Sequence, residues 1–147
     1  MQKLNLPSYN FRIKKEEGSK INIFDTVRKK FVLLTSEEWV RQNFIRYLIH
    51  EKKYPQSLMA VEKQISLNRK LFRFDLVVYG RNGKPLLVAE FKSPETKINQ
   101  GTFDQAVRYN MALKVKIIIV SNGLQHFVCE IDYDTMSYKY LNEVPGY

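Results

Sequence analysis

The sequence predicts an α/β domain with a mixed central β-sheet flanked by helices, and three observations support this fold class. Apolar runs of strand length alternate with segments whose apolar residues recur at helical spacing. An Asn82-Gly83 pair separates two of the apolar runs, which is typical of a β-hairpin. The run at residues 115–120 is almost entirely apolar, so it predicts a strand covered on both faces at the centre of the sheet.

The first helix is predicted from residue 35 to about residue 54. Thr35 can cap its amino end, and Glu37 and Glu38 follow in the first turn, where the helix dipole favours negative charge. The apolar residues of this segment recur at helical spacing and mark the face turned to the core; they include Val40, Phe44, Tyr47 and Leu48.

Three strands are predicted next, over residues 59–67, 72–79 and 85–91, with residues 80–84 as the turn of the hairpin. A second helix is predicted over residues 102–113, with Phe103, Ala106, Val107 and Met111 on or near one face. Strands over residues 115–120, 124–131 and 136–141 complete the chain. The predicted order is therefore helix, three strands, helix, strand and a C-terminal hairpin.

The first 34 residues have the least regular pattern. A charge run at residues 14–17 precedes Gly18, and residues 21–24 are a candidate edge strand. No repeat, low-complexity tract or flexible linker divides the chain. We therefore predict a single domain, in which residues 1–34 form an extension packed on a domain of residues 35–147.

The composition excludes several classes of protein. The chain has 147 residues, 44% of them hydrophobic, which fits one globular domain and excludes disorder. It has neither an apolar run of the roughly 20 residues that a spanning helix needs nor an apolar signal core, so we expect no membrane partner. The single cysteine, Cys129, lies in an apolar stretch and suits a reducing cytoplasm. The net charge of +9 favours a polyanionic partner.

Two acidic residues lie inside apolar strand segments, where an unpaired charge is costly to bury. The strand period places Asp75 on one face with Arg73 and Val77, and Glu90 on one face with Lys92. Each acid lies about seven residues from the turn, so the hairpin brings Asp75 and Glu90 side by side. Two adjacent carboxylates repel each other unless a cation lies between them.

This pair supplies the ligands that Mg²⁺ prefers, which are one or two carboxylates together with water and substrate phosphates. Lys92 would point its ammonium group at whatever the metal holds. The arrangement suits hydrolysis of a phosphodiester bond. The metal polarises the phosphate and lowers the pKa of the attacking water, while the lysine positions that water or stabilises developing charge.

A purely structural role is the alternative for the same residues: buried ion pairs of Asp75 with Arg73 or Lys92, and of Glu90 with Arg108. The Glu-x-Lys triplet carries no weight alone, because it also occurs at Glu51/Lys53 and Glu95/Lys97. Only the position at the end of an apolar strand, with Asp75 on the preceding strand, selects Glu90/Lys92.

At these residues the sequence resembles PD-(D/E)xK nucleases, whose pattern D…(D/E)xK…QxxxY is matched by Asp75, Glu90-Phe91-Lys92 and Gln105-Ala106-Val107-Arg108-Tyr109. More closely, it resembles the N-terminal nuclease domain of type I restriction enzyme R proteins. The similarity runs from residues 37–42 through 54–55 and 61–62 to 121–123, more than half of the chain. It implies a restriction-endonuclease-like fold with an αβββαβ core.

The resemblance also implies roles for individual residues. Asp75 and Glu90 would be metal ligands and Lys92 the catalytic lysine, with Mg²⁺ as cofactor and Mn²⁺ as its substitute. Gln105 and Tyr109, one helical turn apart, would be an accessory pair that helps to position DNA or Lys92.

An acid of the first helix often completes such sites. We favour Glu37 over Glu38, because the spacing places Glu37 on the side of the helix that faces the core. Basic residues cluster around the site in sequence and could follow a phosphate backbone. Of these we assign Arg73, Lys97 and Arg108 to nucleic-acid binding; the others are Lys63, Arg69, Lys70, Arg81 and Lys84.

Two departures from the family pattern accompany the resemblance. Phe74 stands where the family name has proline, and the chain contains no G-x-x-x-x-G-K-S/T phosphate loop, so we expect it to lack an ATP-driven motor.

We expect a Mg²⁺-dependent DNA endonuclease whose partners are DNA and the motor, specificity or methylase subunits of a restriction system. The alternative is a non-catalytic DNA-binding or subunit-docking module, and an RNA-directed or repair nuclease would use the same residues.

Overall fold

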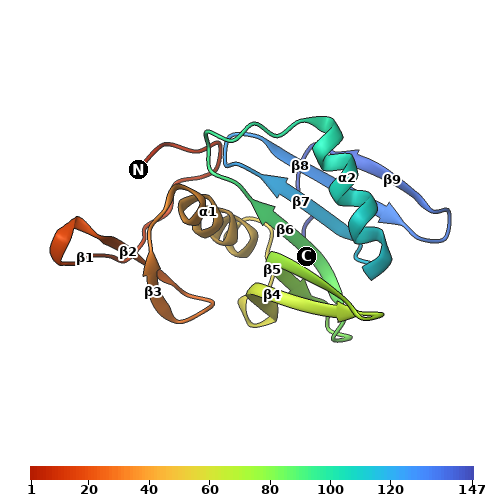
Figure 1. The fold of residues 1–147 in the computed structure, drawn as a ribbon, viewed down its shortest axis with the longest axis horizontal. Coiled ribbons are helices and arrows are strands. Elements are labelled where there is room, and N and C mark those ends of the chain that lie inside the picture. The colour runs from red at the N-terminus through yellow and green to blue at the C-terminus, as the bar shows by residue number, and fades with distance from the viewer.

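A six-stranded β-sheet carries the fold, with one helix packed on each face (Figure 1). The structure is a computed structural model that describes residues 1–147. The strands lie in the order β4 (Met59–Leu67), β5 (Lys70–Tyr79), β6 (Pro85–Phe91), β7 (Ile117–Ser121), β8 (His126–Asp132) and β9 (Ser137–Leu141). The helices are α1 (Ser36–His50) and α2 (Gln100–Asn110). This order confirms the predicted fold class, including the C-terminal hairpin β8–β9.

The sheet is mixed, because β6 and β7 run parallel while every other neighbouring pair is antiparallel. The chain passes from β6 to β7 through α2, as a parallel connection requires. All five residues of β7 are buried, which confirms the prediction of a central strand covered on both faces.

Two apolar cores flank the sheet and fix the two helices. On one face Val40 and Phe44 of α1 pack against a cluster that includes Phe91. On the other face Phe103 and Val107 of α2 pack with strand residues such as Phe74 and Val88. Each of these side chains is almost fully buried, and burying one contributes roughly 1.5–3 kcal/mol. No helix has the length and apolar character needed to cross a membrane.

The β5–β6 hairpin forms at the predicted turn. Tyr79 pairs with Pro85 across it, and Gly83 has φ +77°, a conformation that glycine adopts readily. On the strands, Leu76 pairs with Ala89. The hairpin therefore sets the register of the two strands that carry the predicted acids.

The first helix has the expected capping residue, and both helices have bounds that differ from the predicted ones. The Thr35 hydroxyl accepts a hydrogen bond from the backbone N–H of Glu38, as predicted. α1 ends at His50, four residues before the predicted end, because Lys53 has φ +64° and turns the chain away from the helix. α2 begins two residues earlier than predicted, where the Asn99 side chain accepts from the N–H of Thr102.

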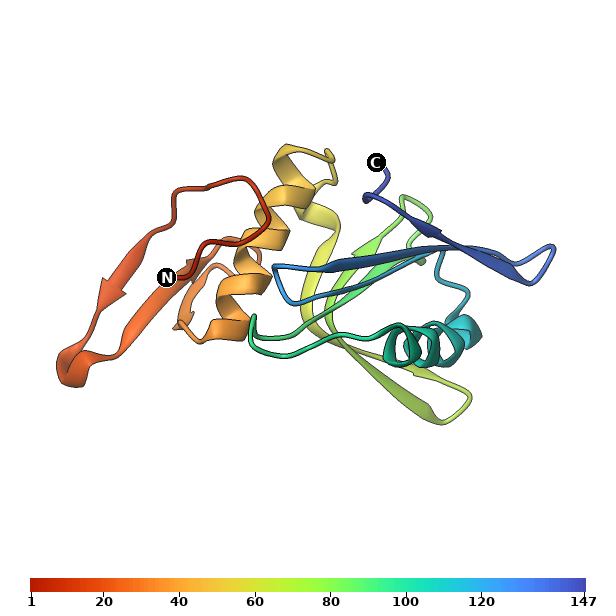
Figure 2. The same cartoon turned by 90° about the horizontal axis from the view of Figure 1, so that it is seen from above.

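Residues before α1 form a separate three-stranded antiparallel sheet beside that helix (Figures 1 and 2). Its strands are β1 (Ile13–Lys15), β2 (Ile21–Asp25) and β3 (Lys30–Leu33). Residues 21–24 were predicted as an edge strand, and this is wrong, since β2 is the central strand of the small sheet. The division between residues 1–34 and 35–147 stays a prediction.

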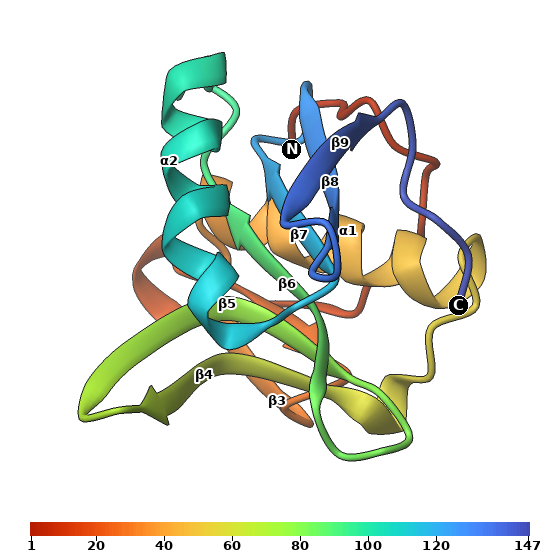
Figure 3. The same cartoon turned by 90° about the vertical axis from the view of Figure 1, so that its right-hand side faces the viewer.

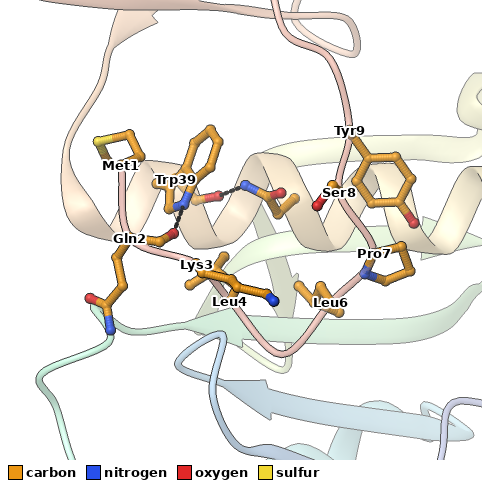
Figure 4. Close-up of a pocket in the computed structure, with 10 residues that line it drawn as sticks. Met1, Gln2, Lys3, Leu4, Leu6, Pro7, Ser8, Tyr9 and Trp39 are labelled. Atoms are coloured by element: carbon orange, nitrogen blue, oxygen red, sulfur yellow. Dashed lines mark hydrogen bonds between the residues drawn. The ribbon is translucent and has the colours of Figure 1, made fainter.

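The first nine residues run along α1 and leave a hollow of about 270 Å³ against Trp39 and Asn43 (Figure 4). The Trp39 indole N–H donates to the backbone carbonyl of Gln2, and the Asn43 amide donates to the carbonyl of Trp39. No carboxylate or imidazole lines this hollow.

Candidate functional site

The predicted acids lie opposite each other where the β5–β6 ladder ends. Leu76 pairs with Ala89, so the next residues along the two strands, Asp75 and Glu90, face each other across the ladder. The Asp75 carboxylate curves back to its neighbour strand, where its Oδ2 accepts a hydrogen bond of 2.7 Å from the backbone N–H of Phe91. The hairpin thus brings the two carboxylates together.

Glu90 is half-buried, and its carboxylate has no hydrogen-bond or ion-pair partner. Burial raises its pKa above the ordinary value, and the negative charges of Asp75 and Glu37 add to the rise while Lys92 opposes it. Its side chain lines a narrow crevice together with Ala106 and Asn110 of α2. Glu90 is therefore an acid gathered with like charges and lacking a counter-ion.

Lys92 follows β6 directly and is exposed. Its backbone N–H donates to the carbonyl of Ser121 on β7, which extends the parallel ladder by one residue. Its ammonium group forms no salt bridge, although its charge lowers the pKa of Glu90. The lysine stands free next to the two acids.

The predicted face of Asp75 needs a correction. Arg73 is exposed, whereas Val77 is buried in the α2-side core together with Phe74. A strict strand period would place Phe74 and Val77 on opposite faces, so the alternation is interrupted next to Asp75. The interruption coincides with Glu62 on β4, which has φ +53° and no ladder partner.

The ion pairs of the structural alternative do not form. Neither Arg73 nor Arg108 makes a salt bridge, and Glu90 has none. Asp75 instead lies near a cation that the sequence analysis missed, because Arg41 of α1 places Nη2 3.4 Å from its Oδ1. This contact connects the strand acids to α1.

Arg41 belongs to a group of six polar residues that we call the arginine cluster: Asp25, Arg28, Glu38, Arg41, Gln42 and Glu62. Within it, Glu38 accepts from Arg28 at 2.6 Å through Oε1 and from Arg41 at 2.7 Å through Oε2. Gln42 donates to both Asp25 and Glu38. The cluster joins the small N-terminal sheet to α1 and to β4.

Asp25 shows how well this cluster compensates its charges. Burial alone would raise its pKa, but hydrogen bonds from the backbone and side chain of Arg28, the charge of Arg28 and a bond from Gln42 hold the pKa below the ordinary value. Its side chain is fully buried and lies 2.5 Å from Nε of Arg28. Asp25 is a buried acid kept ionised by its partners.

Burial and ion pairs distinguish Glu37 from Glu38, and the buried residue is not the one predicted. Glu38 is the buried residue of the two, with a side chain 9% exposed, and both its oxygens are engaged by cations. Glu37 has a side chain 44% exposed and lies close enough to Glu90 to raise its pKa. The argument that Glu37 faces the core is wrong. Its only ion pair is a long one, 3.7 Å to Nη2 of Arg41, and its role at the site stays a prediction.

The predicted accessory pair lies on the exposed side of α2. The side chain of Gln105 is exposed and makes no hydrogen bond. The ring of Tyr109 packs against Phe72 of β5 with centroids 4.8 Å apart and planes tilted by 49°, and the ammonium group of Lys70 lies 4.2 Å from the centre of the Tyr109 ring. No hydrogen bond joins either residue to Lys92, and their roles stay predictions.

The residues predicted to bind nucleic acid are exposed and free of salt bridges: Arg73, Lys97 and Arg108. They lie on β5, after β6 and on α2, all elements that border the strand acids. Arg81 and Lys84 do not lie there, because the β5–β6 turn carries them to the opposite end of β6. Nearness in sequence was misleading for these two.

The site fits a cation held by few protein ligands. No three His, Cys, Asp or Glu side chains lie close enough together to hold a metal ion as a group. The oxygen donors at the strand ends are therefore the pair Asp75 and Glu90, and of these Glu90 has no partner in the protein. A pair of hard oxygen donors suits Mg²⁺, which keeps several water molecules and completes its shell with substrate phosphates.

Sequence reasoning missed Arg41, Arg28 and Asn110. The spacing from Glu38 to Arg41 and Gln42 places all three on neighbouring helix positions, which is a usable signal. Arg28 gives no such signal, because it lies in the turn after β2 and not on a helix face. Of its partners, Asp25 is three residues away, but Glu38 and Glu62 are 10 and 34 residues away. Asn110 has a buried Oδ1 without a partner in the crevice that Glu90 lines, and no motif marks it.

Comparison with known proteins gives two findings. Residues 36–145 match the family model of the type I restriction enzyme R protein N terminus (HSDR_N). Among solved structures, a fragment from Vibrio vulnificus YJ016 described as an HsdR subunit of a type I restriction enzyme has a TM-score of 0.50 and 23% sequence identity. The match covers 77% of this chain and 24% of that chain, and at this identity it supports the predicted restriction-endonuclease-like fold. A comparison with curated proteins gave no match.

Proposed function

The chain belongs to the family of type I restriction enzyme R protein N termini, and from this premise we propose that it is a Mg²⁺-dependent DNA endonuclease domain. The proposed reaction is hydrolysis of a phosphodiester bond at the ends of β5 and β6. Family membership supports a nuclease-related role. The proposal adds the metal, the reaction and the residues.

One observation carries the proposal: Glu90 is a half-buried carboxylate opposite Asp75 that has no partner. Buried charges in proteins are normally paired, because an unpaired one costs several kcal/mol. A divalent cation between the two acids would supply the missing counter-charge. The raised pKa of Glu90 is the signature expected of such a group without its cation.

Asp75 and Glu90 are the residues that would hold Mg²⁺, which when bound polarises the phosphate and lowers the pKa of the attacking water. The backbone N–H of Phe91 and the guanidinium of Arg41 fix the direction of the Asp75 carboxylate. Lys92 is free to hold the attacking water or to stabilise charge that develops on the phosphate.

Calorimetric titration of Mn²⁺ into the metal-free protein tests the site without depending on turnover. We expect binding by the wild type and its loss in Glu90→Gln and Asp75→Asn, because each change removes one anionic ligand. The matched control is Glu95→Gln, since Glu95 has the same Glu-x-Lys spacing but is exposed outside the strands. Equal binding by all four proteins would refute the assignment of ligands.

A second candidate function is a non-catalytic DNA-binding or subunit-docking module. One observation favours it, namely that Asp75 is already engaged by Arg41 and by the N–H of Phe91. Such a module would bind DNA equally well with and without Mn²⁺. The catalytic proposal requires that DNA and Mn²⁺ each increase the affinity for the other, because substrate phosphates complete the metal shell.

The proposed partners are DNA and the other subunits of a type I restriction system. This chain aligns with 24% of the Vibrio vulnificus chain. Copurification with a motor, specificity or methylase subunit, followed by a cleavage assay on the assembled complex, tests this part. Cleavage that appears only in the complex would show that those subunits activate the site.

A further inference from the structure

A second site lies at the opposite end of β6, where the β5–β6 turn meets the segment that leads into β7. A hollow of about 500 Å³ opens there between the two segments. Figure 3 shows this turn below the starts of β6 and β7. From Pro85 to Glu90 the strand rises roughly 16 Å, so the hollow is well separated from the strand acids.

Four cationic side chains line this hollow, and no acidic side chain does: Arg81, Lys84, Lys114 and Lys116. All four are exposed, and none forms a salt bridge. Four like charges around one hollow repel one another unless an anion lies among them. The argument mirrors the one for the two strand carboxylates, with the signs reversed.

The backbone that carries these cations is held by its own hydrogen bonds. In the turn, the N–H of Gly80 donates to the carbonyl of Lys84 at 2.8 Å. In the other segment, the N–H of Lys114 donates to Met111, and the carbonyl of Lys116 accepts from Ile131 of β8 at 2.9 Å. The segments are therefore ordered before any ligand arrives, which lowers the entropic cost of binding.

We propose that this hollow binds phosphate groups, and that their source is the backbone of the DNA on which the strand acids act. Duplex DNA carries a phosphate charge about every 1.7 Å along its axis, so four cations can engage several phosphates at once. The inference goes beyond the proposed hydrolysis, because it requires no metal. It assigns the far end of β6 to holding DNA.

The test measures binding of a short labelled DNA duplex in EDTA over a series of salt concentrations. The test variant combines Arg81→Gln, Lys84→Gln, Lys114→Gln and Lys116→Gln. The control variant removes four exposed lysines scattered over other surfaces: Lys15→Gln, Lys20→Gln, Lys53→Gln and Lys139→Gln. Both variants lose four charges, so a general effect of net charge is the same in each.

We expect the test variant to bind at least about tenfold more weakly than the control. Its dependence on log salt should be shallower by up to about 3.6, since each of the four lost phosphate contacts removes roughly 0.9. A variant that keeps its duplex affinity but loses calorimetric binding of tripolyphosphate would support the phosphate site and assign its ligand to a free polyphosphate. Equal affinities of test and control for both probes would overturn the proposal.

EDTA removes the metal from these measurements, so their outcome is independent of the strand acids. Loss of Mn²⁺ binding in Glu90→Gln tests the proposed function, and loss of duplex binding in the test variant tests the hollow. A circular-dichroism melt of each variant checks that the four substitutions leave the fold intact.

Discussion

The arginine cluster and the strand carboxylates lie side by side, but they differ in whether their buried carboxylates have cationic partners. In the cluster, Asp25 and Glu38 are buried, and arginine guanidinium groups engage both. At the strand ends, Glu90 is half-buried with no partner at all. The pKa of Asp25 is held below its ordinary value and that of Glu90 is raised above it.

This difference teaches how to separate a structural acid from a candidate functional one. A buried carboxylate with its own cations is complete, and it stabilises the fold only through those cations. A buried carboxylate without such cations destabilises the fold when it is ionised, and a bound cation would offset this cost. Arg41 touches both regions, since it binds Glu38 and also lies near Asp75.

Removal of Arg28 should have the largest effect, because it takes cations away from two buried acids. We expect Arg28→Met to lower the free energy of unfolding by about 3–5 kcal/mol, measured by urea denaturation. The control is Lys14→Met, which breaks the exposed pair with Glu16 and should cost less than about 1 kcal/mol. Similar losses in both variants would erase the distinction between the two regions.

Replacement of Lys92 tests the region of the strand carboxylates. Under the proposed function, Lys92→Met should lower the rate of DNA cleavage by about 10²–10³-fold, the effect of removing one group that stabilises transition-state charge. Its urea midpoint should move little, because the side chain is exposed, forms no salt bridge and acts on Glu90 only through its charge. Lys53→Met, from an exposed Glu-x-Lys triplet, should cleave at the wild-type rate. Unchanged cleavage by the Lys92 variant would remove it from the site.

Metal should stabilise only the region that lacks its own cations. Mn²⁺ at 100 times its dissociation constant should add about 2.7 kcal/mol to the free energy of unfolding of the wild type. Glu90→Gln should lose this gain, whereas Glu62→Gln, in the arginine cluster, should keep it. A thermal shift that survives in Glu90→Gln would place the metal elsewhere.

The smallest expected effect concerns pH. The fold raises the pKa of Glu90, so its ionisation costs stability as the pH rises through the range above the ordinary value of 4.5. Glu90→Gln should therefore stabilise the metal-free protein at neutral pH by up to about 1 kcal/mol, and the gain should vanish in acid. Asp25→Asn should destabilise the protein at neutral pH, because the lowered pKa of Asp25 adds to the free energy of unfolding. This contribution is lost only as the pH falls below 3.8. Urea titrations at several pH values compare the two variants.

The sheet could be predicted because its signals are local. An apolar run without alternation marked β7, and Asn82-Gly83 marked the turn that fixes the register of Asp75 and Glu90. The small N-terminal sheet was harder, since its strands have three to five residues and it covers little of the core. Patterns that short carry no clear period.

The identity of the candidate site residues could be predicted, but not their partners. Pairing depends on contacts between distant segments, such as Arg28 with Glu62 and Arg41 with Asp75, each 34 residues apart. Glu38 is engaged by Arg41 three residues away and by Arg28 of the N-terminal segment, whereas Glu90 has no partner, and only the first of these facts has a signal in the local sequence. The family resemblance named the acids, and the structure separates them by their surroundings.

The single parallel pair in the sheet has a consequence for how the chain folds. Strands β4, β5 and β6 form one set of antiparallel hairpin neighbours, and β7, β8 and β9 form another, so each set can assemble from contacts close in sequence. Joining β6 to β7 requires closure of the long segment that contains α2, which is slower because of its loop entropy. Glu90 and Lys92 lie at that seam, so we expect the hairpin to bring Asp75 and Glu90 together early and the burial of Glu90 against α2 to follow in the last step.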